Sequence, residues 1–224
     1  MGKTHPLMAL ALNLALQKFF PPVAQEQPQV DAIPELADIP PVRQLKHKEG
    51  AVVLVLGRRE SGKTILSQRL AQIIGRPTFA ISPEQKPPPW ITELKLEELT
   101  HEPPPWSTLL CDDLPAYLSS HDYSNALAKT LEHLIPVCRH RRKLCLVFLT
   151  QSAAMSDKYV LDSDLIFFKP LNLLFQDLER PAVARLYKAI GPLFDRMTEA
   201  ERRRHAFLLS PDWRGLVRIN LPDG

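Results

Sequence analysis

The sequence predicts an α/β fold, in which a mostly parallel sheet is flanked by helices and the C-terminal residues add an antiparallel edge. Short apolar runs without alternation, such as Ala51–Leu56 and residues 144–149, are typical of strands buried on both faces. Segments with apolar residues at helical spacing separate these runs, and strands that alternate with helices form parallel sheets. Near the C-terminus, two β-prone runs are joined by the short turn 211–215, which favours antiparallel pairing.

The overall composition is that of an ordinary globular protein. The chain has 224 residues, of which 45% are hydrophobic and 24% charged, and its formal net charge is +3. This length suits one α/β domain with extensions, and the charge is too small to imply nucleic-acid binding by itself. The three cysteines, Cys111, Cys138 and Cys145, cannot all pair, so we expect buried thiols, and no Cys or His spacing predicts a metal site.

The chain divides into three regions. Residues 1–20 contain an apolar segment too short to span a bilayer, which we expect to form a helix that docks on the domain or on a partner. Attachment of this helix to a membrane surface is the alternative. Residues 21–48 are predicted to be a proline-rich linker that stays extended, and residues 49–224 form the main domain.

The segment GRRESGKT, residues 57–64, directly follows the first apolar run and matches the pattern G-x-x-x-x-G-K-[ST] of a phosphate-binding P-loop. Its glycines let the backbone turn around a phosphate, and the N–H groups of the loop and the next helix face the anion. Lys63 is expected to reach the β- and γ-phosphates of ATP, and Thr64 to ligate Mg²⁺. A glycine-rich turn without nucleotide is the alternative, but the strand before and the helical pattern after the loop favour the P-loop. The residues predicted to bind the nucleotide are Gly57, Arg58, Arg59, Glu60, Ser61, Gly62, Lys63 and Thr64.

Two adjacent acids, Asp112 and Asp113, follow the apolar run 107–111. Asp112 is predicted to hold Mg²⁺ opposite Thr64, directly or through water. Asp113 is placed to orient or deprotonate the attacking water, and its alternative role is a helix cap. A second acid in this role separates ATPases from nucleotide kinases and GTPases.

ATPases of this kind have an additional strand between the P-loop strand and the acidic strand, and it ends in a polar residue that senses the γ-phosphate. Residues 144–149 have the form of that strand. We therefore expect Gln151, or else Thr150, to hydrogen-bond the γ-phosphate or the attacking water. A plain polar strand end is the alternative.

The basic run RHRRK, residues 139–143, allows three interpretations. In a multimer, Arg139, Arg141 or Arg142 could reach the ATP of a neighbouring subunit as an arginine finger. The run could instead contact nucleic-acid phosphates, or it could be a solvated helix end.

Further elements are expected along the chain. Thr78–Ile81 and Leu165–Phe168 are predicted strands, and Pro181 is expected in the first turn of a helix. Thr198 and Glu201 form a capping box that opens a short helix ending in the arginines 202–204. Residues 83–106 carry two proline triplets, and we expect a surface excursion held down by Trp90 and Trp106, with peptide binding as the alternative.

Taken together, four segments resemble the FtsK/HerA-type genome-packaging ATPases of double-stranded DNA viruses and their poxvirus-like relatives, which are P-loop NTPases of the ASCE (RecA-like) class. The segments are GRRESGKT, LLCDD, RHRRKLCLVFLTQS and DLIFFKP, and the resemblance covers roughly residues 50–222. It implies a homo-oligomeric ring that uses ATP and Mg²⁺ to thread double-stranded DNA into a capsid. It also implies roles for Lys63, Thr64, Asp112, Asp113 and Gln151, although many related ATPases have Glu at the position of Asp113.

The resemblance implies a location in the host cytoplasm or in the virion at a packaging vertex. The N-terminal segment has no counterpart in the family, and one hypothesis is that it anchors the motor to a capsid or membrane-vertex protein. The other functions considered are a helicase-loader or plasmid-transfer type ATPase, a small-molecule kinase with residues 202–204 as a lid, and a non-catalytic nucleotide switch.

Overall fold

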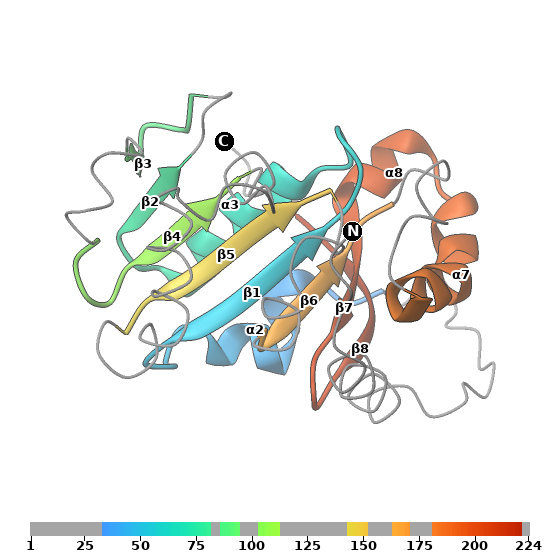
Figure 1. The fold of residues 1–224 in the computed structure, drawn as a ribbon, viewed down its shortest axis with the longest axis horizontal. Coiled ribbons are helices and arrows are strands. Elements are labelled where there is room, and N and C mark those ends of the chain that lie inside the picture. The colour runs from blue at the N-terminus through green and yellow to red at the C-terminus, as the bar shows by residue number, and fades with distance from the viewer. Residues whose placement is uncertain are drawn as a thin grey trace, which may run out of the picture.

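A computed structural model describes residues 33–81, 86–94, 103–112, 143–151, 163–170 and 181–220. Its centre is an eight-stranded mixed sheet with the order β3-β2-β4-β5-β1-β6-β7-β8 (Figure 1). Neighbouring strands from β3 to β6 are parallel, whereas β7 is antiparallel to both β6 and β8. The predicted fold class, including its antiparallel C-terminal edge, is therefore confirmed. The strands are β1 Ala51–Leu56, β2 Thr78–Ile81, β3 Ile91–Glu93, β4 Thr108–Cys111, β5 Cys145–Thr150, β6 Leu165–Phe168, β7 His205–Leu209 and β8 Arg214–Arg218.

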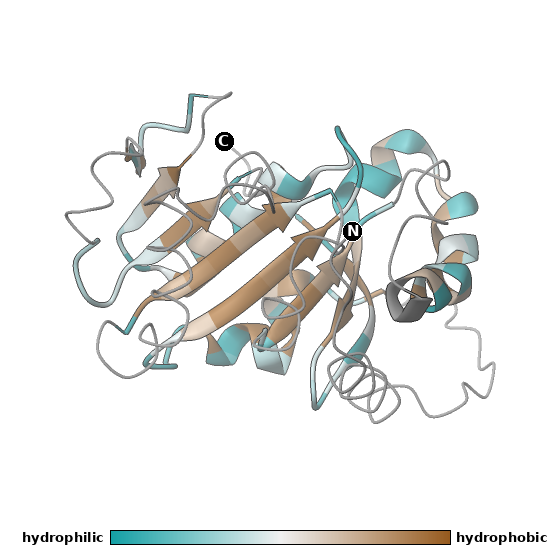
Figure 2. Ribbon diagram, in the orientation of Figure 1, coloured by the Kyte–Doolittle hydropathy of each residue, from teal (hydrophilic) through white to brown (hydrophobic). Residues whose placement is uncertain are grey.

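Helices cover both faces of the sheet. The described helices are η2 Leu36–Asp38, α2 Pro40–Gln44, α3 Lys63–Ile74, α7 Pro181–Asp195 and α8 Glu199–Arg204. The apolar side chains of α2 and α3 pack with Val53 and Val55 on one face, and those of α7 pack with Val52 and Leu54 on the other. In Figure 2 the central strands of the sheet are coloured as hydrophobic, whereas α8 is mostly coloured as hydrophilic. The predicted capping box of α8 is present, with Thr198 and Glu201 bonded to each other's backbone N–H groups.

The central strands β1 and β5 are buried along their whole length, as continuous apolar runs predict. They pair in register from Ala51 opposite Cys145 to Leu56 opposite Thr150. Cys111 and Cys145 are buried free thiols, as expected, and Cys138 lies outside the described residues.

The prediction of an extended linker is wrong for residues 33–48. This stretch forms η2 and α2, and Leu36, Ile39, Val42 and Leu45 are each at most 2% exposed in the core beside α3. The prolines do not prevent this, because Pro40 begins α2, where a missing N–H costs nothing. Residues 1–32 lie outside the described part of the chain, and within that part no helix has the length and apolar character needed to cross a membrane.

The two tryptophans differ from the expected anchors. Trp90 is 44% exposed and Trp106 is 42% exposed. The ring of Trp106 is covered by cations, with the Arg76 guanidinium 4.7 Å and the Lys143 ammonium 5.3 Å from its centroid. The segment between the prolines also contributes the short edge strand β3, which the proline content did not suggest.

Candidate active site

The P-loop lies at the carboxyl edge of the parallel strands and is bonded to the strands on both sides of β1. The Gly57 N–H donates to the Thr150 carbonyl at the end of β5 (3.1 Å), and the Arg58 N–H donates to the Pro170 carbonyl after β6 (2.9 Å). The loop then turns at Gly62, whose φ of 88° is a left-handed conformation, and α3 begins at Lys63. The loop is therefore fixed at the strand ends where α/β folds bind ligands.

The side chain of Lys63, at the end of the P-loop, bonds back to the beginning of the same loop. Its ammonium group donates to the Gly57 carbonyl and to the Arg58 carbonyl, both at 2.9 Å. From this position the ammonium lies within the turn, so a bound phosphate would offer it stronger, charged acceptors than these two carbonyls. The placement agrees with the predicted role of Lys63, which stays a prediction.

The predicted metal ligands are brought together. The Thr64 hydroxyl donates to a carboxylate oxygen of Asp112 across 3.4 Å, although the two residues are far apart in the sequence. One hydroxyl and one carboxylate are hard oxygen donors, and Mg²⁺ is usually bound by one or two carboxylates with waters and substrate phosphates completing its octahedron. Among the described residues there is no group of three or more His, Cys, Asp or Glu that could hold a metal alone. The donor set therefore fits Mg²⁺ bound together with a nucleotide.

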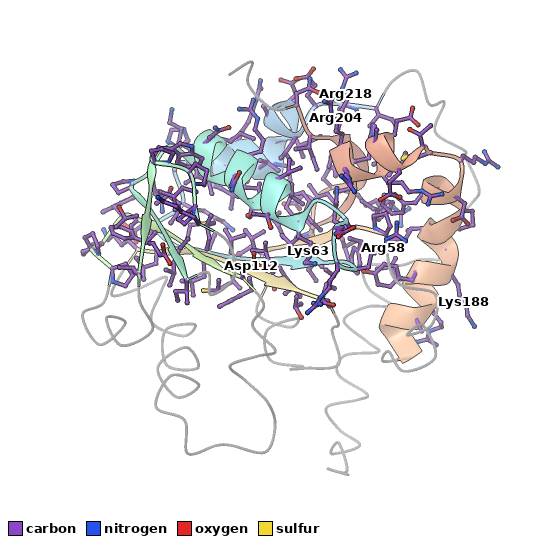
Figure 3. All side chains as sticks on the ribbon, turned by 90° about the horizontal axis from the view of Figure 1, so that it is seen from above. Arg58, Lys63, Asp112, Lys188, Arg204 and Arg218 are labelled. Atoms are coloured by element: carbon purple, nitrogen blue, oxygen red, sulfur yellow. The ribbon has the colours of Figure 1, made fainter. Side chains whose placement is uncertain are left out.

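The additional strand expected between the P-loop strand and the acidic strand is present. β5 pairs with β1 on one side and with β4 on the other. Gln151 directly follows β5, and Asp112 directly follows β4. Both side chains therefore begin at the edge that carries the P-loop. Figure 3, which views the molecule from above, shows Asp112, Lys63 and Arg58 in that order across the picture.

A small, solvent-open cleft lies beside Thr64 and Asp112. Its apolar floor includes Ala80 and Leu110, and Lys86 lines it as well. Lys86 thus lines the same cleft as the predicted metal ligands. Nothing in the sequence singled it out, because it stands among prolines in a connection between strands.

The other loop residues differ in their surroundings. Arg59 and Glu60 are exposed, and Glu60 has a positive φ of 58°. Arg58 forms an ion pair with Glu199 at the start of α8 (3.0 Å), so its charge is directed to α8. The Ser61 hydroxyl is buried and has no hydrogen-bond partner among the described residues.

Four predicted catalytic residues, Asp113, Arg139, Arg141 and Arg142, lie outside the described residues. Lys143, at the end of the basic run, precedes β5 and lies beside the beginning of β1, at the edge of the sheet opposite the P-loop. Six residues of strand separate the two edges, which is roughly 20 Å. The described end of the basic run is therefore remote from the P-loop of its own subunit.

A buried lysine within the segment DLIFFKP, to which the sequence analysis assigned no role, lies behind the loop. Lys169 follows β6, is 0% exposed, and donates to the carbonyls of Arg203 (2.8 Å), Arg202 (3.0 Å) and His205 (2.6 Å). Burial, and then the positive charge of Lys63, lower the pKa of Lys169 to about 7. A lysine after an apolar run reads as a solvated strand end, which is why the sequence alone did not reveal it.

Gly62 is packed against the end of α8, and this predicts a strong effect of substitution. A Cβ on Gly62 would lie 2.6 Å from the Arg203 carbonyl oxygen, and the φ of 88° strains any L side chain. We expect Gly62→Ala to lower the free energy of unfolding by about 2 kcal/mol and to weaken nucleotide binding strongly, because the loop must shift. Chemical denaturation and titration with an ATP analogue measure both.

Gly75→Ala is the matched control, since Gly75 also has a positive φ (67°) but its Cβ would find the nearest atom at 3.9 Å. It should lose about 1 kcal/mol of stability and keep its nucleotide affinity. Equal affinities of Gly62→Ala and the wild type would show that the loop tolerates displacement from α8.

Comparison with solved structures shows the same fold at low sequence identity. The DNA-packaging ATPase B204 from Sulfolobus turreted icosahedral virus aligns with a TM-score of 0.50 and 10% identity, over 78% of this chain and 99% of that chain. The genome-packaging NTPase B204 from Sulfolobus turreted icosahedral virus 2 aligns with a TM-score of 0.52 and 10% identity in complex with sulfate, over 79% of this chain and 100% of that chain. Its complex with AMPPCP gives the same score and identity over 78% and 100%.

No protein-family model matches the sequence, and no curated protein sequence matches it. The resemblance inferred from the four sequence segments is thus confirmed at the level of the fold. The chain has the P-loop NTPase fold that these viral genome-packaging ATPases share.

Proposed function

We propose that this protein hydrolyses ATP with Mg²⁺ and uses the energy to translocate double-stranded DNA, as a motor that packages a viral genome. The observation that carries the proposal is the order β4-β5-β1 at the P-loop edge. It places Asp112, Gln151 and residues 57–64 on three adjacent strand ends, which is the arrangement of ATPases that activate water rather than of nucleotide kinases. The similarity of the fold to the genome-packaging NTPase B204 supports the packaging role.

Each residue has a defined part in this proposal. The loop N–H groups and Lys63 bind the phosphates, and Thr64 and Asp112 hold Mg²⁺, which would neutralise charge developing on the phosphates. Gln151 orients the γ-phosphate or the attacking water, and Asp113 accepts a proton from that water.

In this proposal the basic run, residues 139–143, acts on a neighbouring subunit or on the DNA. Arg139, Arg141 or Arg142 act as a finger on a neighbour's ATP or contact the DNA backbone. Lys143, the last residue of the run, lies at the edge opposite its own P-loop. The finger role requires a ring or another close assembly of subunits. Contacts to the backbone carry no sequence information, so we expect translocation to be insensitive to DNA sequence.

Measuring ATP turnover with and without double-stranded DNA, at several protein concentrations, tests the proposal. We expect stimulation by DNA and a steep increase of specific activity with protein concentration, because the site is completed by a neighbour. Phosphoryl transfer to an added small acceptor, without DNA stimulation, would contradict it and favour a kinase. Slow turnover that ignores both DNA and concentration would favour a nucleotide switch.

A further inference from the structure

Both glycines of the P-loop pack against Lys169 itself or against a carbonyl that Lys169 bonds. A Cβ on Gly57 would lie 2.5 Å from the Cβ of Lys169, so the stem of this lysine is one wall of the loop. A Cβ on Gly62 would lie 2.6 Å from the Arg203 carbonyl oxygen, to which the Lys169 ammonium donates at 2.8 Å. The lysine therefore touches the beginning of the loop directly and its end through one carbonyl.

The carbonyls around the ammonium group of Lys169 equal its hydrogens in number and are opposite to it in charge. Its three hydrogens meet three carbonyl oxygens, of Arg202, Arg203 and His205, at the C-terminal end of α8. Carbonyls at a helix C-terminus carry partial negative charge. Without a cation there, this end of α8 would repel a phosphate held by the other side of the same loop.

We propose that Lys169 is a positioning residue for the nucleotide, whose ammonium group holds the end of α8 against Gly62 and shields the bound phosphates from its carbonyls. The inference rests on nucleotide binding at the P-loop, which is part of the proposed function. The ion pair between Arg58 and Glu199 supports this inference, because it links the beginning of α8 to the same loop.

A consequence is that nucleotide binding and protonation of Lys169 favour each other. The pKa of about 7 applies without nucleotide, and the negative phosphates oppose the effect of Lys63 and raise the pKa. We expect the protonated protein to bind nucleotide about tenfold more tightly than the deprotonated protein. Affinity is then highest below about pH 7 and falls as the pH rises above it. The charged or titratable residues near Lys169 are Lys63 on α3, Arg58 in the loop, and Glu199, Arg202, Arg203 and His205 on α8 and at the start of β7.

Titration of an ATP analogue with Mg²⁺ between pH 6.5 and 9 tests the inference in the full chain. We expect the wild type to lose about tenfold in affinity over this range, and Lys169→Met to bind about tenfold more weakly at pH 6.5 without that loss. Lys48→Met is the matched control, since Lys48 pairs with Asp164 just before β6, at the opposite end of that strand. It should follow the wild-type profile.

Calorimetry of the wild type at pH 8 in two buffers of different ionisation enthalpy gives a readout that does not depend on the folding of a variant. It should show net proton uptake on binding. A folded Lys169→Met with wild-type affinity and pH profile, or the absence of proton uptake by the wild type, would overturn the inference while leaving ATP binding intact. A wild type that binds no nucleotide at any pH would overturn the proposed function as well.

Discussion

Replacing Lys63 by alanine is expected to lower ATP turnover by about a thousandfold or more. The ammonium of Lys63 is held in the loop by two backbone carbonyls and would move to the phosphates, where it stabilises charge that develops during hydrolysis. Removing one positioned donor that stabilises developing charge costs about 10²–10³ in rate, and here it also removes ground-state affinity for the nucleotide. Steady-state phosphate release with ATP and Mg²⁺ measures the effect.

The matched control is Lys46→Ala, because Lys46 is an exposed lysine next to the opposite edge of the sheet. Its turnover should equal that of the wild type. Lys46→Ala should leave the free energy of unfolding unchanged, whereas Lys63→Ala should lower it by about 1 kcal/mol, because two part-buried carbonyls lose their donor. Wild-type turnover in a folded Lys63→Ala protein would mean that the P-loop is not where ATP is hydrolysed.

Asp112→Asn and Asp113→Asn are expected to fail in different ways. The Asp112 carboxylate faces the Thr64 hydroxyl, so the amide should raise the Mg²⁺ concentration needed for half-maximal turnover by about a hundredfold. Asp113→Asn should keep the affinities for nucleotide and Mg²⁺ and lose about 10²–10⁴ in rate, the contribution of a general base. Binding titrations and turnover at increasing Mg²⁺ separate the two effects.

Asp212→Asn, at an exposed turn before β8, is the control for both substitutions. It should have no effect on either measurement. Unchanged turnover of purified Asp113→Asn would remove that residue from the mechanism. An unchanged Mg²⁺ requirement of Asp112→Asn would move the metal site away from Thr64.

The parts of the fold that the sequence predicted are those where one physical requirement determines the residues. A strand buried on both faces must be continuously apolar, as Ala51–Leu56 is, and a loop that wraps a phosphate needs glycine at Gly57 and Gly62. The polar residues after β4 and β5 were informative for the same reason, because parallel strands bring their carboxyl ends to one edge. Pairing of β5 between β1 and β4 then followed the expectation.

The parts that were missed depend on tertiary contacts. Leu36, Ile39, Val42 and Leu45 recur every three residues and lie in the core, a helical signal that the surrounding prolines concealed. The segment that contains Lys169 did not indicate the role of this residue, because its ammonium group bonds to carbonyls of α8, more than thirty residues later in the chain. A buried charge is determined by what surrounds it in space, and local sequence does not contain that information.

Displacement of a triplex-forming third strand from linear double-stranded DNA tests the central claim most directly, because a translocating motor strips the third strand as it moves. With ATP and Mg²⁺, we expect the wild type to release the third strand, and neither Lys63→Ala nor a non-hydrolysable ATP analogue to support release. The rate should not depend on the sequence of the DNA between the free end and the triplex. An assembled wild-type protein that hydrolyses ATP in the presence of DNA and leaves the third strand bound would contradict translocation.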